Sequence, residues 1–172
     1  SEMCIRDRAK VYDCREGQPS VRYLDNNLGI QNDMAYRPAY EAGGAGLAST
    51  IDDYAKFTQM LLNGGTYNGV QILRPATVKF LGGHTLSAVQ QAGFDNWIGL
   101  EGFSYGNLMR VLVDPTRAVT LGSKGEFGWD GWLGCYMEVV PEQNMTFLMM
   151  TQKKDAGTYT LSRKIRNIIF SE

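Results

Sequence analysis

The side chains that could catalyse a reaction are few, and their spacing restricts the chemistry. The one histidine, His84, follows Gly82-Gly83 and is not accompanied by a Gly-x-Ser-x-Gly nucleophile elbow, so a Ser-His-Asp mechanism is not indicated. The cysteines Cys4, Cys14 and Cys135 include no Cys-x-x-Cys pair, so neither a zinc site nor a complete disulfide framework is predicted. We interpret the cysteines as buried or incidental thiols, expect no metal, and interpret His84 as a loop residue.

Two other patterns suggest cofactors and are better explained by structure. Gly44-Ala45-Gly46 has no strand before it and no third glycine after it, which favours a turn at a helix entry over a dinucleotide-binding loop. The methionines of the segment from Met145 to Thr151 fit core packing rather than a metal or cofactor site. The sequence therefore predicts no organic cofactor.

The composition is that of a folded domain. Apolar residues make up 44% and charged residues 20% of the 172 residues, and the net charge is -1. This charge gives no electrostatic reason to expect nucleic acid or an anionic membrane as a partner. No apolar run approaches the roughly 20 residues of a transmembrane helix, and no signal-peptide pattern begins the chain. The compartment and the oligomeric state stay open.

The first half of the chain predicts a hairpin and several helices. Two short apolar runs between Lys10 and Leu24 flank a Gly-Gln-Pro turn, which predicts the hairpin. Apolar residues then recur at helical spacing from Ile51 to Leu61, after a Ser-Thr capping pattern and before Asn63-Gly64-Gly65, which ends the helix. We also expect a loop over residues 25–38, a turn at residues 68–69, a short helix over 75–81 and another over 85–93.

The second half predicts a sheet and a closing helix. The predicted strands run from Asn107 to Val113, Phe127 to Trp132, Gly134 to Val140 and Met145 to Thr151, and a tight hairpin joins the last two. The last segment is apolar on both faces, which predicts a central strand. Helical spacing of apolar residues from Leu161 to Ile169 predicts an amphipathic helix on the sheet. Helices followed by antiparallel strands and a closing helix indicate the α+β class.

Two stretches resemble one known family. The segment from Gly43 to Phe57 combines a Gly-Gly-Ala-Gly entry with Ser-Thr-x-x-Asp and is similar to a helix of class C β-lactamases and related esterases. The segment from Gly128 to Tyr136, which continues into Val140-Pro141-Glu142, is similar to the third active-site strand of that family. The resemblance covers about Lys10 to Phe170. It implies a β-lactamase/transpeptidase-like fold, an antiparallel sheet flanked by helices, of which the N-terminal part is missing.

The resemblance implies an acyl-enzyme mechanism. In the family, the serine of Ser-x-x-Lys attacks a carbonyl, the lysine and the tyrosine of Tyr-x-Asn manage its proton, and two backbone N–H groups stabilise the oxyanion. No serine of this chain has lysine three residues later, and the family places both motifs upstream of the Gly-rich helix entry. We therefore expect residues 9–172 to be the C-terminal part of a single domain. Residues 1–8 resemble an adapter-derived translation at the end of a metagenomic reading frame, and we expect a non-native leader there, in which Cys4 has no function.

The third active-site motif falls at Trp129-Asp130-Gly131, counted back from the Pro141-Glu142 hairpin. The family carries Lys-Thr-Gly here in β-lactamases and Trp-x-Gly in esterase-like members. The resemblance makes the backbone N–H of Trp132 one donor of the oxyanion hole and makes Trp129, Asp130 and Gly131 substrate-binding residues. Without the lysine, the cation that would hold a β-lactam carboxylate is lost, which favours an esterase, amidase or peptidase.

Three alternative interpretations concern the same region. Ser123-Lys124-Gly125 contains a lysine, but its order differs from Lys-Ser/Thr-Gly. Tyr105-Gly106-Asn107 matches Tyr-x-Asn but follows the Gly-rich helix and leads directly into a strand, so we do not expect it to be catalytic. Trp129 and Trp132 could also be two aromatic residues that cover a sheet edge.

The leading hypothesis is a bacterial serine hydrolase related to β-lactamases and penicillin-binding proteins. It would act on a small-molecule ester or amide or on a peptide-like substrate, and this chain alone would be inactive. The alternative is a non-catalytic binding or structural domain that keeps the fold. The upstream sequence would discriminate the two, because only the enzyme needs Ser-x-x-Lys.

Overall fold

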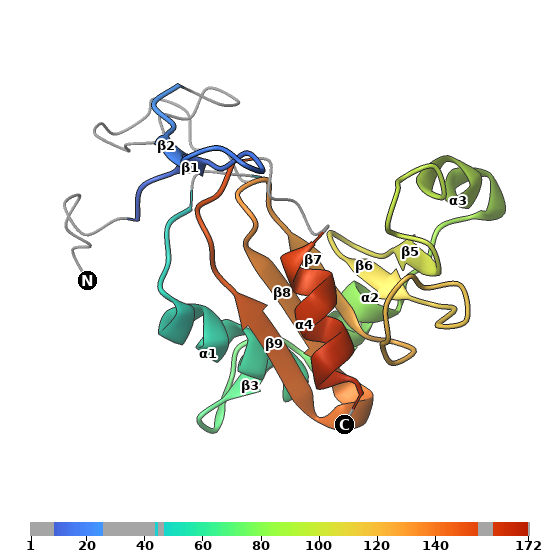
Figure 1. Ribbon diagram of the computed structural model, residues 1–172. Helices are drawn as coiled ribbons and strands as arrows, with labels where there is room; N and C mark the ends of the chain where they lie inside the picture. Colours follow the sequence, from blue (N-terminus) through green and yellow to red (C-terminus); the bar gives the residue numbers. More distant parts are fainter. Residues whose placement is uncertain (1–8, 26–43, 45–46, 155–159, 172) are drawn as a thin grey trace.

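The chain is described from a computed structural model, which covers residues 9–25, 44, 47–154 and 160–171. Its central element is a five-stranded antiparallel sheet in which each strand pairs with the next along the chain (Figure 1). The strands are β5 (Phe103–Tyr105), β6 (Arg110–Leu112), β7 (Phe127–Asp130), β8 (Tyr136–Val140) and β9 (Met145–Met149). The short 3-10 helix η2 (Pro141–Gln143) joins β8 to β9. The predicted antiparallel sheet is confirmed, and β5 adds a strand at one edge that the sequence did not predict.

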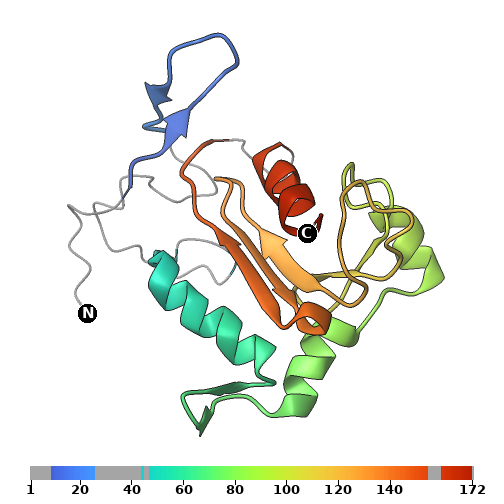
Figure 2. The same cartoon turned by 60° about the horizontal axis from the view of Figure 1, so that its bottom comes forward.

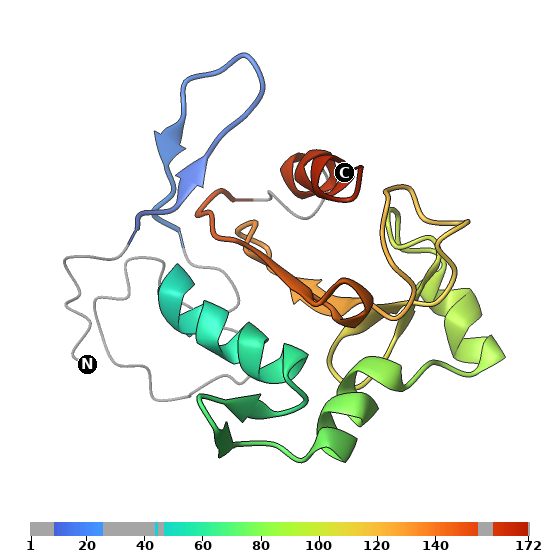
Figure 3. The ribbon, with the colours of Figure 1, turned by 90° about the horizontal axis from the view of Figure 1, so that it is seen from below.

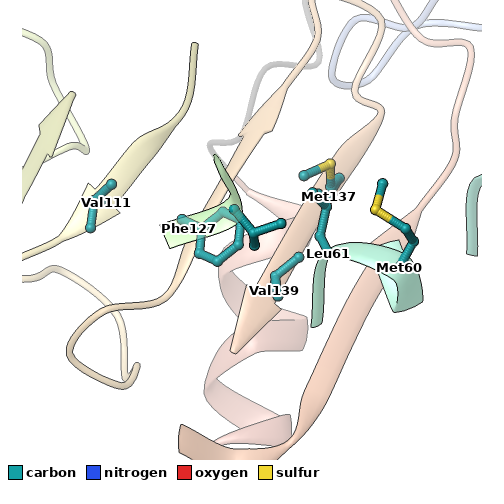
Figure 4. Close-up of a cluster of buried hydrophobic side chains, with 7 residues drawn as sticks. Met60, Leu61, Val111, Phe127, Met137 and Val139 are labelled. Carbon is teal, nitrogen blue, oxygen red and sulfur yellow. The ribbon is translucent and has the colours of Figure 1, made fainter. Parts of the chain in front are cut away.

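Helices cover both faces of the sheet. Figure 3 shows α1 (Ile51–Leu62) and α2 (Pro75–Gly83) on one face and α4 (Leu161–Ile169) on the other. The main core lies between the sheet and the first two helices (Figure 4). Its buried members are Met60, Leu61, Val78, Val111, Phe127, Met137 and Val139. This arrangement confirms the predicted α+β class.

Local sequence signals explain the start and the end of α1. The Thr50 hydroxyl accepts a hydrogen bond from the Asp53 N–H at 3.2 Å, which satisfies one of the free donors of the first turn. At the other end the Gly65 N–H donates to the Met60 carbonyl at 2.8 Å. Gly65 has φ +100°, and a Cβ there would lie 2.1 Å from the Leu73 carbonyl oxygen, so only glycine fits. The predicted helix is confirmed.

The smaller elements also follow the sequence. The hairpin of β1 (Tyr12–Asp13) and β2 (Val21–Arg22) is antiparallel, as predicted. A second hairpin joins β3 (Thr66–Tyr67) to β4 (Val70–Gln71) around the predicted turn at residues 68–69. Figure 2 shows this second hairpin beside the end of α1. The predicted helix within residues 85–93 is found as α3 (Ala88–Phe94).

Two predictions about packing are wrong. Among the described strands, β9 pairs only with β8 and therefore lies at the sheet edge, not at the centre. Its residues are half-buried on both faces, which explains why its sequence reads as that of a central strand. The apolar face predicted for α4 packs only in part: Ile165 and Ile169 are half-buried but Leu161 and Ile168 are exposed, whereas the polar Ser162 and Arg166 are buried.

Two predicted strand bounds are also too long. β7 ends at Asp130 and β8 begins at Tyr136, because Gly131 to Cys135 form a turn. Gly134 has φ +84°, which extended backbone does not adopt. The predicted leader at residues 1–8, residues 26–38 of the predicted loop, and Gly43, Ala45 and Gly46 of the predicted helix entry lie outside the described residues.

Candidate active site

The end of β7 that carries the third motif has one open edge. The β7–β8 ladder continues to the pairs Trp129↔Met137 and Asp130↔Tyr136. The β6–β7 ladder stops earlier, at Arg110↔Gly128. Among the described strands, the edge of Trp129 and Asp130 that faces away from β8 therefore has no ladder partner. A ligand can approach a strand from such an edge.

The turn after β7 is held rigidly. The Gly131 N–H donates to the Cys135 carbonyl at 2.8 Å, and the Gly134 N–H donates to the Gly131 carbonyl at 2.9 Å. The Leu133 carbonyl accepts a hydrogen bond from the Thr151 hydroxyl at 2.7 Å, which ties the turn to the end of β9. The backbone that follows the motif is thus fixed before any ligand binds.

Gly131 and Gly128 differ in the space around them. A Cβ on Gly131 would approach nothing closer than the Cys135 carbonyl oxygen at 3.9 Å. A Cβ on Gly128 would lie 2.0 Å from the Met137 carbonyl oxygen. Packing among the described residues therefore requires glycine at 128 and does not require it at 131, where room for a ligand is a reason for glycine.

Trp132 lies beside the N-terminal hairpin. The Tyr23 ring contacts the Trp132 ring edge-on, with centroids 5.9 Å apart. The hairpin is tied to the chain after β9, since the Tyr12 N–H donates to the Gln152 carbonyl and the Lys154 N–H donates to the Tyr12 carbonyl. The role of the Trp132 N–H in an oxyanion hole stays a prediction.

Trp129 belongs to an aromatic cluster. Its ring lies 5.3 Å from the Tyr105 ring and 6.5 Å from the Trp97 ring, centroid to centroid. Phe94, at the end of α3, contacts both Tyr105 and Trp97. Tyr105 is the tyrosine of the Tyr-x-Asn match that we did not expect to be catalytic. In the structure its ring contacts Trp129 of the third motif. The Asn107 side chain donates instead to the Phe80 carbonyl at 3.2 Å.

Half-buried Asp130 forms an ion pair with a buried arginine, which the sequence did not reveal. Its carboxylate accepts a hydrogen bond from the Arg110 guanidinium at 2.6 Å, and the Arg110 side chain is 4% exposed. The pKa of Asp130 is raised, because burial outweighs the opposing effect of Arg110. No local signal could have found this pair, since its members lie on different strands.

A larger ionic cluster joins α4 to the sheet. The Arg166 guanidinium donates hydrogen bonds to the Glu126 carboxylate at 2.6 Å and to the Tyr136 hydroxyl at 3.0 Å. It also donates to the Glu138 carboxylate. Burial, followed by the charge of Glu138, raises the pKa of Glu126 to about 8. Burial also raises the pKa of Tyr136 to about 12. One guanidinium thus faces two buried carboxyl groups, which favours the protonated form of Glu126.

The remaining sequence candidates lie elsewhere. Ser123-Lys124-Gly125 precede β7 in a turn closed by the Glu126 N–H and the Ser123 carbonyl, so they lie at the opposite end of β7 from Asp130. His84 follows α2 as its C-cap and is exposed.

The state of the cysteines and the groups that could bind a metal are known for the described residues only. Cys14 and Cys135 are free and half-buried, and Cys4 lies outside the described residues. The Cys135 thiol donates to the Thr151 carbonyl at 3.3 Å. Where the chain is described, no three His, Cys, Asp or Glu side chains group as metal ligands would. No helix in the same residues has the length and apolarity to cross a membrane.

Comparison with known proteins defines the family. The beta-lactamase family model matches residues 7–168. The uncharacterized protein MT1414 of Mycobacterium tuberculosis (strain CDC 1551 / Oshkosh) is 34% identical over 122 residues, which is 67% of this chain and 30% of that relative. The protein Rv1367c of M. tuberculosis strain H37Rv matches with the same figures. The chain belongs to the beta-lactamase family, as its resemblance indicated.

Solved structures support the same fold. EstCE1, a hydrolase with promiscuous acyltransferase activity, matches with a TM-score of 0.70 at 22% identity, over 94% of this chain and 43% of EstCE1. A LovD6 mutant of simvastatin synthase (LovD) from Aspergillus terreus matches with a TM-score of 0.69 at 17% identity, over 97% of this chain and 42% of that protein. The chain thus spans less than half the length of these relatives.

Proposed function

We propose that this chain forms one wall of the active site of a serine hydrolase that acts through an acyl-enzyme on an ester or amide. The nucleophile would come from a Ser-x-x-Lys segment outside these 172 residues, in which no such motif occurs. The backbone N–H of Trp132 would be one oxyanion donor, and Trp129, Asp130 and Gly131 would line the substrate.

The open edge of β7 carries this proposal. The ladder to β6 ends one residue before Trp129, and the turn that follows is held by its own hydrogen bonds. A fixed backbone at an accessible edge is what an oxyanion donor requires, since the donor must lie about 2.7 to 3.1 Å from the developing charge. The room beside Gly131 is consistent with a substrate that lies against this edge.

A labelling experiment tests the proposal. A fluorophosphonate probe is applied to the 172-residue chain and to a longer protein that joins the chain to its upstream segment. We expect stoichiometric labelling of the longer protein at the Ser-x-x-Lys serine and none of the chain. Labelling of a serine within the 172 residues would refute the placement of the nucleophile.

A non-catalytic binding domain is the second candidate. The observation that favours it is the lack of Ser-x-x-Lys in these 172 residues. It predicts that the longer protein also remains unlabelled and hydrolyses no p-nitrophenyl ester, although it keeps the aromatic cluster around Trp129.

A further inference from the structure

Among the described residues, two cations lie close to the third motif, and each has a carboxylate of the chain as its partner. The Arg110 guanidinium donates to Asp130 at 2.6 Å. On the other side of the motif, the Lys154 ammonium lies 4.9 Å from the centroid of the Tyr23 ring, which contacts Trp132, and 3.7 Å from the Asp13 carboxylate. These two charges are therefore balanced by carboxylates of the chain.

The Arg110 side chain is also closed off by its surroundings. Its guanidinium carbon lies 4.7 Å from the centroid of the Tyr136 ring and 5.7 and 5.9 Å from those of Phe103 and Trp129. The cavity beside it, between the sheet and α4, has a volume of about 20 Å³. That space holds about one water molecule. A carboxylate group from outside does not fit beside Arg110 while Asp130 occupies its place.

Asp130, unlike Arg110, is accessible from the solvent. The Asp130 side chain is 21% exposed, whereas that of Arg110 is 4% exposed. The carboxylate is therefore the more accessible group of the pair, and a ligand that reaches the pair meets it before the guanidinium. Like charges repel, so Asp130 disfavours a substrate carboxylate at this position.

We propose that Asp130 is a specificity-determining residue, which neutralises Arg110 and restricts the site to substrates without a carboxylate near the scissile bond. This inference rests on the proposed function for its catalytic part. It assigns uncharged esters or amides as substrates and excludes penicillins and peptides whose free C-terminal carboxylate lies next to the scissile bond. Asp130 occupies the position where a substrate carboxylate would otherwise contact a buried cation.

The first test needs no catalysis. In the 172-residue chain, Asp130→Ala removes the internal carboxylate and leaves Arg110 without its ion-pair partner. Acetate should then raise the unfolding midpoint of this variant by about 2 to 4 °C relative to chloride at equal ionic strength. The wild-type chain and the double variant Arg110→Met/Asp130→Ala should show no such difference. Equal midpoints of Asp130→Ala in acetate and chloride would overturn the inference.

The second test measures specificity in the protein that carries the nucleophile. The kcat/KM of phenyl butyrate is compared with that of 3-carboxyphenyl butyrate, whose carboxylate lies on the leaving-group side of the ester bond, as the carboxylate of a penicillin or of a C-terminal residue does. Wild type should prefer the uncharged ester, and Asp130→Asn should reduce the preference by roughly tenfold. An unchanged ratio in Asp130→Asn would overturn the inference, and this variant also decides the question if Asp130→Ala does not fold.

The two tests separate the inference from the proposed function. Hydrolysis of neither ester by wild type would refute the proposed function, while stabilisation of Asp130→Ala by acetate would still establish that Asp130 holds the place of an external carboxylate. Equal hydrolysis of both esters by wild type would keep the hydrolase and refute the inference.

Discussion

Replacing Arg166 by methionine tests the buried ionic cluster that joins α4 to the sheet. The substitution keeps most of the side-chain volume and removes the cation from the cluster with Glu126 and Glu138. Arg166 is 3% exposed, and the two carboxylates are 1% and 2% exposed. The guanidinium also donates to the Leu121 carbonyl at 2.8 Å. The variant therefore leaves two buried carboxylates and a carbonyl without their main donor.

The expected loss is large. Removing one partner of a buried ion pair costs about 3 to 5 kcal/mol, a substantial part of a total unfolding free energy of roughly 5 to 15 kcal/mol. For a chain of this length the loss lowers the unfolding midpoint by roughly 6 to 20 °C. Thermal unfolding followed by circular dichroism measures it. The deficit should be smaller at pH 5 than at pH 8, because protonation removes the uncompensated carboxylate charges.

An exposed arginine supplies the control. Arg117 pairs with Asp95 at 3.4 Å, and its side chain is 55% exposed. Arg117→Met should leave the unfolding midpoint almost unchanged, because exposed ion pairs contribute little to stability. If Arg166→Met were as stable as Arg117→Met at pH 8, the assignment of the buried cluster as a main attachment of α4 would be wrong.

Three further substitutions have defined outcomes. The pKa of Glu126 is raised from 4.5 to about 8, so between these pH values the folded chain keeps a proton that the unfolded chain releases. Wild-type stability should therefore fall as the pH rises from about 4.5 to about 8. Urea unfolding of Glu126→Gln should show a weaker fall. Thr50→Ala should cost about 1 kcal/mol in urea unfolding through loss of the helix cap, whereas Ser49→Ala, which removes no cap, should be neutral. Gly128→Ala should lower the unfolding free energy by about 3 kcal/mol or more, because its Cβ would lie 2.0 Å from the Met137 carbonyl oxygen and must push β7 away from β8. Faster amide exchange in β7 would detect this separation.

Local patterns were sufficient to predict most secondary structure. The cap at Thr50, the glycines after α1 and the hairpin between β8 and β9 depend on neighbouring residues, so the sequence displays them directly. The antiparallel order of β7 to β9 follows from short connections between consecutive strands. These features required no knowledge of distant contacts.

Pairings between distant residues could not be predicted in the same way. Arg110 and Asp130 lie 20 residues apart, and Arg166 and Glu126 lie 40 apart. Their contacts depend on strand register and on the rotation of α4. The apolar spacing in α4 suggested that Ile168 faces the sheet, but the ionic cluster draws Arg166 inward instead. A hydrophobic pattern does not indicate a buried charge that has partners on another element.

The candidate site was predicted from resemblance more than from physical pattern, and the roles of its residues stay predictions. The open edge of β7 and the space beside Gly131 leave room for a ligand there. The contact of Tyr105 with Trp129 was missed, because a literal Tyr-x-Asn match in the wrong order gave no reason to expect it there. Its proximity follows from the pairing of β5 with β6, which brings Tyr105 opposite Arg110.

The most direct test of the central claim is the activity of Gly131→Val in the protein that joins this chain to its nucleophile. A Cβ at Gly131 meets nothing within the chain closer than 3.9 Å, so the unfolding free energy should change by no more than about 1 kcal/mol. The side chain would occupy the approach to the strand edge, so kcat/KM for p-nitrophenyl butyrate should fall by roughly 10²-fold or more. A folded Gly131→Val variant with normal kcat/KM would contradict the assignment of this strand to the active site.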